Sequence, residues 1–529
     1  MTNQTVMAVD VGTRSARAGV FSASGALLGR AEHPILVHNP QSDHAEHDGE
    51  DIWQAVGIAT REARERAGVA AEDVVGLSFD ATCSLVALDH EDRPLSVSTT
   101  GENRWNTIVW MDHRAIAEAE ECTATGHHVL ASVGGVMSPE MEIPKLMWLK
   151  RYLPDRWRGY GRILDLADFL TFRASGANSR SCCTVTCKWT YLAHEDVGWQ
   201  ADFLDTVGLS DLAERAALPA RAVAVGAQLG KLTDEAAAHL GLTTACDVGA
   251  GLIDAHAGAL AALGPTLSEG GSGLDHHLGL IAGTSTCHMA LSQQPREVAG
   301  VWGPYFGAVV PDLWLNEGGQ SATGALLDHI LHWHAEGRAL ANHGHEAILK
   351  KIETMRAAEG ESFAKRLHVL PDFHGNRSPL ADPHAVGVIS GLTLDSSIES
   401  LARLYYRTAV GIALGTRHIL DALNANGYAI NHLHVAGGHT KNPLLMELYA
   451  DATGCKVVSP AEEDVVLQGT AIVAAAAAGL YPDLGGAAAA MARAGNVIEP
   501  HAARRLSYEQ DYRVFLTMQG QRSALDSMI

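Results

Sequence analysis

The sequence predicts an α/β protein of two sizeable domains with a ligand cleft between them. Its 529 residues exceed what one hydrophobic core usually organises. Helical patterns, such as residues 51–68, alternate with short apolar strands, such as residues 74–79. Two similar strand–turn–strand segments lie about half a chain apart, which indicates a weak internal duplication with one copy in each domain. A Gly- and Ser-rich stretch at 264–277 is the best boundary candidate, so we place the domains at 1–265 and 266–529.

The first copy of the repeated plan stands at the beginning of the chain. Strands are expected in TVMAVD, ARAGVF and ALLGRAE, and the first two are joined by the turn Gly12-Thr13-Arg14-Ser15. Such a turn can point several backbone N–H groups and a hydroxyl into one concavity, which suits phosphate oxygens. A plain β-hairpin is the alternative. Asp10 ends the first strand, and a carboxylate beside a phosphate cradle makes chemical sense if Mg²⁺ stands between them.

The second copy, residues 278–291, again has a strand, a Gly-Thr turn at Gly283-Thr284-Ser285-Thr286 and a returning strand. Farther on, Gly437 and Gly438 follow a strand directly, where the missing side chains let a flat ligand approach the backbone; a tight turn is the alternative. The established nucleotide motifs are not present. The segment from Gly226 to Lys231 has three spacer residues where a P-loop has four, and no G-x-G-x-x-G joins a strand to a helix.

Composition narrows the class of protein. The sequence has 39 Lys and Arg against 61 Asp and Glu, a net charge of −22 spread along the chain. This balance argues against a nucleic-acid or anionic-membrane partner. The apolar run at 471–480 has about half of the roughly 20 residues that a membrane-spanning helix needs, so we expect a buried helix. Eight scattered cysteines and a start without the pattern of a secretory signal predict reduced thiols and a cytoplasmic location.

Several clusters of reactive side chains have simple interpretations. Cys182, Cys183 and Cys187 lack the second Cys or His pair of a structural zinc site, so we interpret them as reduced thiols at a strand edge. The acidic and histidine residues of 44–48 are expected on a solvated loop before a helix. Cys83 has no base near it in the sequence, which argues against a covalent nucleophile.

In combination, these motifs resemble the FGGY family of carbohydrate kinases. The resemblance extends from about residue 5 to residue 515 and rests on four motifs: Asp10-x-Gly12-Thr13-x-Ser15-x-Arg17, Gly251-Leu-Ile-Asp254, Gly283-Thr284-Ser285, and Ala436-Gly437-Gly438 with Asn442. It implies the two-domain fold of the actin-like ATPases. The first domain would bind sugar and carry the first phosphate loop, and the second would carry the other loop and bind adenosine.

The resemblance also implies ATP and Mg²⁺ as cofactors and assigns roles to individual residues. Asp10 would hold Mg²⁺, and Asp254 would be the catalytic base; a helix cap is the alternative for a lone Asp at a strand end. The phosphate loops would consist of Gly12, Thr13, Arg14, Ser15, Arg17, Gly283, Thr284 and Ser285. The residues that would face the nucleoside are Gly324, Gly437, Gly438 and Asn442.

The substrate is suggested by the segment after residues 74–79. Thr82-Cys83-Ser84-Leu85-Val86 resembles the D-ribulokinase branch of the family, and its small polar side chains leave room for a polyol. Lys188 and Glu317 resemble sugar-contacting residues of ribulokinases, although Lys188 would also suit an exposed strand. The segment from Trp110 to Arg114 resembles a feature near the sugar pocket, with a structural ion pair as the alternative.

The prediction is therefore an ATP-dependent D-ribulokinase whose partner is a small-molecule sugar, with no nucleic acid and no membrane. L-ribulose or another ketose or polyol as substrate stays open, as do a non-catalytic sugar or nucleotide sensor on the same fold and a homodimer. One departure from the family pattern is Glu46-His47-Asp48-Gly49, where many members have Glu-Gln-Asp-Pro. We expect this change to lie away from the chemistry.

Overall fold

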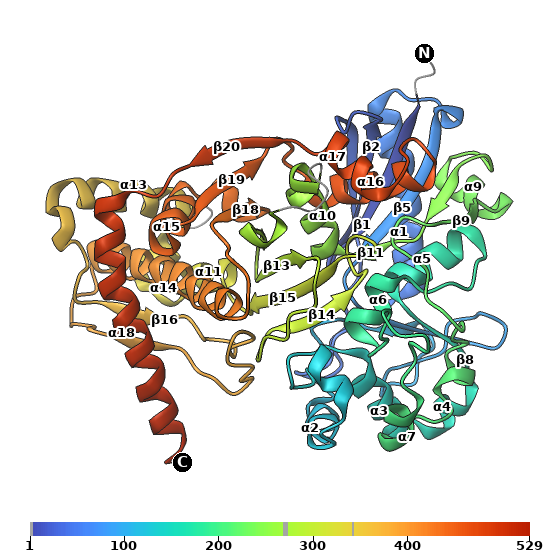
Figure 1. Ribbon diagram of the computed structural model, residues 1–529, viewed down its shortest axis with the longest axis horizontal. Helices are drawn as coiled ribbons and strands as arrows, with labels where there is room; N and C mark the ends of the chain where they lie inside the picture. The colour runs from blue at the N-terminus through green and yellow to red at the C-terminus, as the bar shows by residue number, and fades with distance from the viewer. Residues whose placement is uncertain (1–3, 268–272, 341–342, 529) are drawn as a thin grey trace.

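The computed structural model describes residues 4–267, 273–340 and 343–528 and shows two large sheets, each with helices packed on it (Figure 1). The first sheet has the order β3-β2-β1-β5-β10-β9, with β11 beside β5. Its strands are β1 (Thr5–Val11), β2 (Ser15–Ser22), β3 (Leu27–Pro34), β5 (Val74–Ala81), β9 (Gln228–Lys231), β10 (Asp247–Gly249) and β11 (Leu252–Ile253). The antiparallel run β1-β2-β3 confirms the predicted meander.

The second sheet has the order β14-β15-β13-β12-β18-β19-β20. Its strands are β12 (His277–Ala282), β13 (Thr286–Ser292), β14 (Trp302–Phe306), β15 (Trp314–Gln320), β18 (His432–Ala436), β19 (Lys456–Pro460) and β20 (Ala494–Ile498). The hairpin β12-β13 repeats β1-β2 down to its turn. The Gly12 N–H donates to the Ser15 carbonyl at 3.0 Å, and the Gly283 N–H donates to the Ser285 carbonyl at 2.9 Å.

Helices from both halves of the chain cover the first sheet. One face packs against α1 (Gly49–Ala67) and α5 (Leu166–Ser175), and the other against α10 (Asp254–Leu267), α16 (Val465–Ala477) and α17 (Leu484–Met491). Helix α1 begins where the Asp48 carboxylate accepts the N–H groups of Glu50 and Asp51. The apolar run at 471–480 lies largely in α16, which is buried as predicted, and α16 and α17 lie beside β2 in Figure 1.

The second sheet packs with α11 (Gly324–Trp333), α14 (Ile398–Ala425) and α15 (Pro443–Thr453), and α18 (Ala502–Asp526) joins the same core. Helix α10 lies between the two sheets, because it contacts α16 on one side and β12 on the other. It continues through Gly264 to Leu267, so the first residues of the stretch predicted as a loop are helical, while 268–272 lie outside the described residues. The domain boundary at 265/266 stays a prediction.

A smaller sheet and further helices complete the described chain. The sheet has the order β4-β7-β6-β8. Its strands, and the pair β16-β17, are β4 (Glu46–Asp48), β6 (Leu85–Asp89), β7 (Trp105–Ile108), β8 (Tyr160–Asp165), β16 (His368–Leu370) and β17 (Val388–Ser390). The further helices are α2 (Ile116–Ala124), α3 (Glu142–Tyr152), α4 (Pro154–Gly159), α6 (Cys182–Lys188), α7 (Ala201–Thr206), α8 (Leu212–Arg215), α9 (Asp234–Leu240), α12 (Ala335–Ala339) and α13 (Gly344–Glu359). Within the described ranges, no helix is long and apolar enough to cross a membrane.

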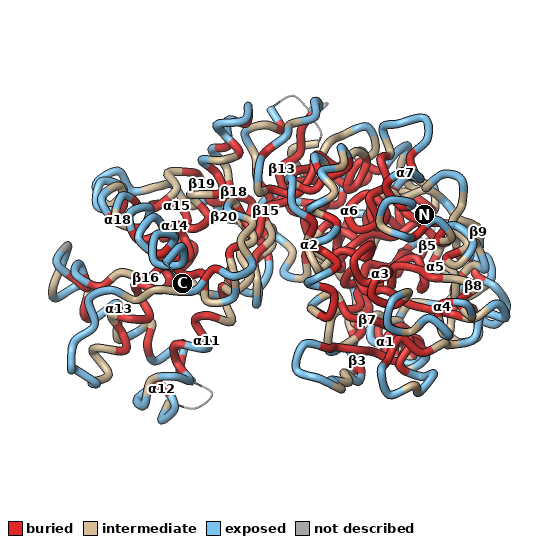
Figure 2. Tube along the Cα trace, turned by 90° about the horizontal axis from the view of Figure 1, so that it is seen from below, coloured by how far each residue is buried: buried red, intermediate tan, exposed pale blue. Residues whose placement is uncertain are grey.

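The prediction of a solvated loop at 44–48 is wrong. His44, Glu46, His47 and Asp48 are all buried, and the tube around β7 and α1 is largely buried in Figure 2. The physical reason is an ion pair. Arg114 Nη2 lies 2.9 Å from Glu46 Oε1 and 2.7 Å from Asp112 Oδ2, and all three side chains are inaccessible to solvent. Paired charges can be buried where single ones cannot.

The cysteines at 182–187 lie on helix α6 and not on a strand. Ser181 caps this helix, because its hydroxyl accepts the Cys183 N–H at 3.2 Å. Cys183 and Cys187 are four residues apart and therefore lie on one face of the helix. The cap outweighs the β-branched and cysteine-rich composition that favoured a strand.

Candidate functional site

Three aspartates stand together where parallel strands of the first sheet end. Asp10 and Asp80 are register partners on β1 and β5. Asp254 follows β11, whose Ile253 lies opposite Ala81. Ligands of open α/β sheets bind outside the carboxyl ends of the strands, so this edge is the expected place for chemistry. Sequence reasoning missed Asp80 as a site residue, although it ends an apolar strand just as Asp10 does.

Asp10 is fully buried and faces one cation. Arg17 Nη2 lies 2.5 Å from Asp10 Oδ2, but neither Asp10 oxygen accepts a well-aligned hydrogen bond. Burial raises the pKa of Asp10 to about 6, with Arg17 opposing the shift and Asp254 adding to it. Carboxylate oxygens without donors are the ligands that Mg²⁺ prefers. The residues present therefore fit a magnesium ion next to Asp10.

Asp80 is buried against Asp10 and is held from the far end of the chain. Burial, and next the charge of Asp10, raise the pKa of Asp80 well above its usual value. The hydroxyl of Thr470, on α16, donates a hydrogen bond to Asp80 Oδ2. Two acids side by side in a dry site cannot both carry a full charge, so Asp80 is best described as the protonated partner of Asp10.

Asp254 is half-buried at the first position of α10. Its Oδ1 accepts the Ala255 N–H at 2.7 Å, so the side chain also contacts the start of its own helix. Burial raises the pKa of Asp254, while the Ala255 N–H and Arg17 act in the opposite direction. A carboxylate whose pKa is raised is a better proton acceptor near neutral pH than an exposed one.

The first Gly-Thr turn is held by two aromatic side chains. The Trp110 indole N–H donates to Thr13 Oγ1 at 3.0 Å, and His47 Nε2 lies 3.0 Å from the Thr13 carbonyl oxygen. We expected the departure at 46–49 to lie away from the chemistry. His47 instead contacts the predicted phosphate loop. The Ser15 hydroxyl donates to Glu32 at 2.7 Å, and Arg14 is exposed.

The second turn meets the start of helix α11 and the end of strand β18. The Gly324 N–H donates to the Gly283 carbonyl at 3.1 Å, and a Cβ at Gly324 would lie 2.5 Å from that oxygen. Gly437 has φ +88°, and a Cβ there would lie 2.6 Å from the Ala282 carbonyl oxygen. Gly283, Thr284, Gly437 and Gly438 are exposed, whereas the Ser285 side chain is half-buried. The backbone at the ends of β12 and β18 is therefore accessible to a ligand.

Asn442, predicted to face the nucleoside, also has a structural role. Its Oδ1 accepts the N–H groups of Leu444 and Leu445 at 3.1 and 3.2 Å, which caps α15. The side chain is half-buried, so the cap fixes its position next to the exposed Gly437 and Gly438.

The predicted sugar-contacting segment follows β5 directly and is buried. Thr82 Oγ1 and Ser84 Oγ are 3.1 Å apart, and Ser84 Oγ accepts the Trp110 N–H at 3.2 Å. Trp110 thus joins this segment to the first Gly-Thr turn. Burial raises the pKa of Cys83 to about 12, with Lys188 opposing the shift, so the side chain is a neutral thiol and a poor nucleophile.

Lys188 and Glu317 bring the two halves of the chain together. Lys188 ends α6, is 3% exposed and places its Nζ 4.4 Å from the centre of the Trp302 ring, so it is not an exposed strand lysine. Burial lowers the pKa of Lys188, but Cys83, Glu317 and other nearby groups together act more strongly in the opposite direction. The net pKa lies well above its usual value, so the lysine stays charged. Glu317 lies on β15 and influences the pKa of Asp254, as does Lys188. The three side chains therefore lie close enough together for their charges to interact.

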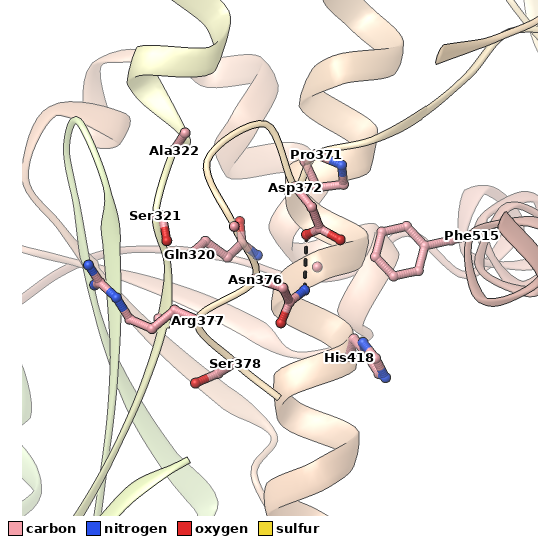
Figure 3. Close-up of a pocket in the computed structure, with 13 residues that line it drawn as sticks. Gln320, Ser321, Ala322, Pro371, Asp372, Asn376, Arg377, Ser378, His418 and Phe515 are labelled. Carbon is pink, nitrogen blue, oxygen red and sulfur yellow. Dashed lines mark hydrogen bonds between the residues drawn. The ribbon is translucent and has the colours of Figure 1, made fainter. Parts of the chain in front are cut away.

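Arg377 is a residue that sequence reasoning missed. Its Nη2 lies 3.0 Å from Glu140 Oε1, which links the two halves of the chain, and its guanidinium stands 5.4 Å from the same Trp302 ring. Arg377 also lines the pocket in Figure 3, together with Gln320, Asp372 and Asn376. None of the predicted site residues lines this pocket. No motif around Arg377 marked it in the sequence.

Comparison with known proteins agrees with this geometry. The N-terminal domain of the FGGY family of carbohydrate kinases matches residues 5–261, and the C-terminal domain of that family matches residues 278–478. An FGGY carbohydrate kinase domain-containing protein of Xenopus laevis is 43% identical over 96% of this chain and 95% of its own. A D-ribulokinase of Saccharomyces cerevisiae is 39% identical over 89% of this chain and 71% of its own.

The fold has relatives among solved structures as well. The crystal structure of xylulose kinase from Rhodospirillum rubrum superposes with a TM-score of 0.77, covers 99% of both chains and is 23% identical. This likeness confirms the predicted two-domain sugar-kinase fold. Because the family match extends over most of the sequence and both halves of the site, the chain belongs to the FGGY family of carbohydrate kinases.

Proposed function

We propose that this carbohydrate kinase transfers the γ-phosphoryl group of ATP to the terminal hydroxyl of D-ribulose, which gives D-ribulose 5-phosphate. The observation that carries the proposal is the position of Asp254. It lies half-buried at the carboxyl edge of the first sheet, where its charge interacts both with Asp10 and Arg17 and with Lys188 and Glu317. The anionic phosphate side and the polyol side of a transfer reaction meet at this residue.

The chemistry follows from these positions. A sugar hydroxyl is a poor nucleophile, and Asp254 accepts its proton as the phosphoryl group passes across. Arg17 and the open backbone of the turns at Gly12 and Gly283 bind phosphate oxygens, and Gly437 with Gly438 admits the nucleoside. Mg²⁺, held by Asp10, supplies positive charge that offsets the charge of the phosphates.

D-ribulose is favoured over other sugars by two observations. The segment Thr82-Cys83-Ser84 offers two hydroxyls and a neutral thiol at the end of β5, close to the charged pair Lys188 and Glu317. Small donors and acceptors of this kind suit a polyol chain. In addition, a relative that is 39% identical carries the name D-ribulokinase. A cytoplasmic location and a homodimer remain parts of the proposal that rest on the sequence alone.

The test is a phosphoryl-transfer assay with D-ribulose, L-ribulose, D-xylulose and other ketoses or polyols. We expect the highest kcat/KM with D-ribulose, and a loss of about 10²- to 10⁴-fold in kcat for Asp254→Asn. If kcat/KM is higher with L-ribulose or another polyol, that compound and not D-ribulose is the substrate. Full activity of a folded Asp254→Asn protein would show that Asp254 is not the catalytic base. Binding of sugar and ATP by the wild type without any phosphoryl transfer would indicate a sensor.

A further inference from the structure

We propose that Cys183, Cys187 and His256 bind a thiophilic divalent cation of the Zn²⁺ class, with Glu317 as the fourth ligand. From the sequence, the cysteines appeared to lack a histidine partner. The fold supplies one from another element, because α6 packs against β11 and His256, on α10, approaches Cys187. Lys188, one of the predicted sugar-contacting residues, directly follows Cys187 at the end of α6, so the cation would lie next to the predicted sugar site.

The distances fit a tetrahedral ion. The ligand atoms of Cys183, Cys187 and His256 all lie within 4.8 Å of one another, and Cys187 Sγ is 3.5 Å from His256 Nε2. Zinc bonds of about 2.3 Å to sulfur and about 2.0–2.1 Å to nitrogen place these two atoms about 3.5 Å apart. Glu317 Oε2 lies 3.7 Å from His256 Nε2, is buried and accepts no hydrogen bond. Three donors thus converge, and a buried carboxylate oxygen without a hydrogen-bond partner lies beside one of them.

The surroundings suit a soft cation and not Mg²⁺. Cys183, Cys187 and His256 are at most 1% exposed, and Cys183 Sγ accepts the Ile253 N–H at 3.3 Å, a bond that stabilises a thiolate. Burial lowers the pKa of His256 to about 4, so its ring is neutral and able to bind a metal at pH 7. Thiolate and imidazole ligands select zinc-like ions, whereas Mg²⁺ requires oxygen.

Charge and protons balance on binding. Two thiols lose their protons to solvent as two metal–sulfur bonds form, and no electron is transferred. Two thiolates and the Glu317 carboxylate carry one negative charge more than the cation, and the buried Lys188 ammonium offsets it. Because each thiol gives up a proton when it binds the cation, affinity should rise with pH.

Glu317 would bind either the cation or the sugar, so the two ligands should compete. In the proposed function, on which this step rests, Glu317 contacts the sugar. A cation that recruits its carboxylate withdraws it from the sugar. Zinc should therefore raise the KM for sugar more than it lowers kcat. In equilibrium binding, zinc should raise the Kd for sugar, and sugar should raise the Kd for zinc by the same factor.

The direct test does not depend on activity. The full-length protein is freed of metal with a chelator and titrated with Co²⁺ while its absorption spectrum is recorded. We expect one equivalent to bind with a thiolate-to-cobalt charge-transfer band, and Zn²⁺ to displace it. The other candidate cluster in the described part of the chain, His127 with His128 and Asp202, has no sulfur and cannot give this band.

Variants locate the site. Cys187→Ser and His256→Gln should remove the band or weaken binding at least about tenfold, whereas Cys246→Ser, at another fully buried cysteine, should leave it unchanged. X-ray absorption of the zinc-loaded wild-type protein, which needs no variant, should show two sulfur ligands and at least one nitrogen. The proposal is overturned if the wild type gives no band, if Cys187→Ser binds Co²⁺ as tightly as the wild type with an unchanged band, or if the zinc ligands are only nitrogen and oxygen.

Discussion

At the scale of single residues, the central feature is a pair of acids at the same position on neighbouring strands. Asp10 and Asp80 face each other at the ends of β1 and β5, with Arg17 as the cation beside Asp10. Such a pair titrates as a unit, and one proton is shared between the two carboxyls. The pair thus keeps a single negative charge at the place where a metal would bind.

Loss of this negative charge by protonation should be visible in the pH dependence of kcat/KM. Burial raises the pKa of Asp10 to about 6, so Asp10 becomes protonated as the pH falls through this value, and burial also raises the pKa of Asp254. Protonation removes the metal ligand and the base, so kcat/KM should fall below about pH 6. Initial rates from pH 5 to 8 at fixed Mg²⁺ measure this, with circular dichroism as the check that the protein stays folded. A flat profile down to pH 5 would contradict it.

Cys83 should affect sugar preference and not the chemistry. It is a buried neutral thiol on the segment that follows β5. Cys83→Ala removes one weak donor and leaves a small gap, so the kcat/KM ratio between two ketopentoses should change by about tenfold. Cys246→Ala, at a buried cysteine outside this segment, is the matched control. Abolished phosphoryl transfer in a folded Cys83→Ala protein would refute the assignment.

At the scale of elements, the second phosphate turn is held in place by direct contact between its backbone and that of helix α11. The N-terminus of α11 lies against the turn at Gly283, with room for no side chain at Gly324. Gly324→Ala forces the turn and the helix apart, at a cost of about 1–3 kcal/mol.

This displacement should raise the KM for ATP about tenfold and leave the KM for sugar nearly unchanged. Steady-state kinetics with each substrate varied in turn measure the effect. The matched control is Gly520→Ala on α18, where an added Cβ meets no atom within 4 Å. Equal KM values for ATP in both variants would show that the turn does not bind the nucleotide.

Elements with a strong local pattern could be predicted from the sequence, and those decided by distant contacts could not. The two hairpins, helix α1 and the Ala-rich helix α16 follow from alternation, caps and apolar periodicity. Strand β4 was missed because its burial depends on Arg114, more than sixty residues away. The composition of α6 favours a strand, and only the cap at Ser181 decides for a helix.

At the scale of the whole molecule, the site consists of groups that no local motif connects. The turn residues and Asp254 stand in motifs that could be found in the sequence. The convergence of Lys188 with Glu317, the ion pair of Arg377 with Glu140, and the meeting of His256 with the α6 cysteines depend on how the two sheets pack around α10. Spacing along a chain does not contain that information.

The N-terminal half should not form a stable unit by itself. Helices α16 and α17 supply much of the core that covers β1 and β5, and Ala471, Ile472 and Val473 are fully buried there. A fragment of residues 1–265 lacks them and exposes an apolar sheet face, so we expect it to aggregate or to unfold without cooperativity. Size-exclusion chromatography and thermal denaturation, compared with the full chain, measure this. A monomeric fragment with a cooperative transition would contradict it.

The hydrogen bond from Thr470 to Asp80 also concerns the order of events during synthesis. A ribosome delivers the first sheet long before it delivers α16, and nascent domains usually fold as they emerge. Here the carboxylate cluster is completed only when residue 470 has left the exit tunnel. A chain that stops before residue 470 lacks the hydrogen bond that holds Asp80 beside Asp10, so we expect it to assemble no active centre.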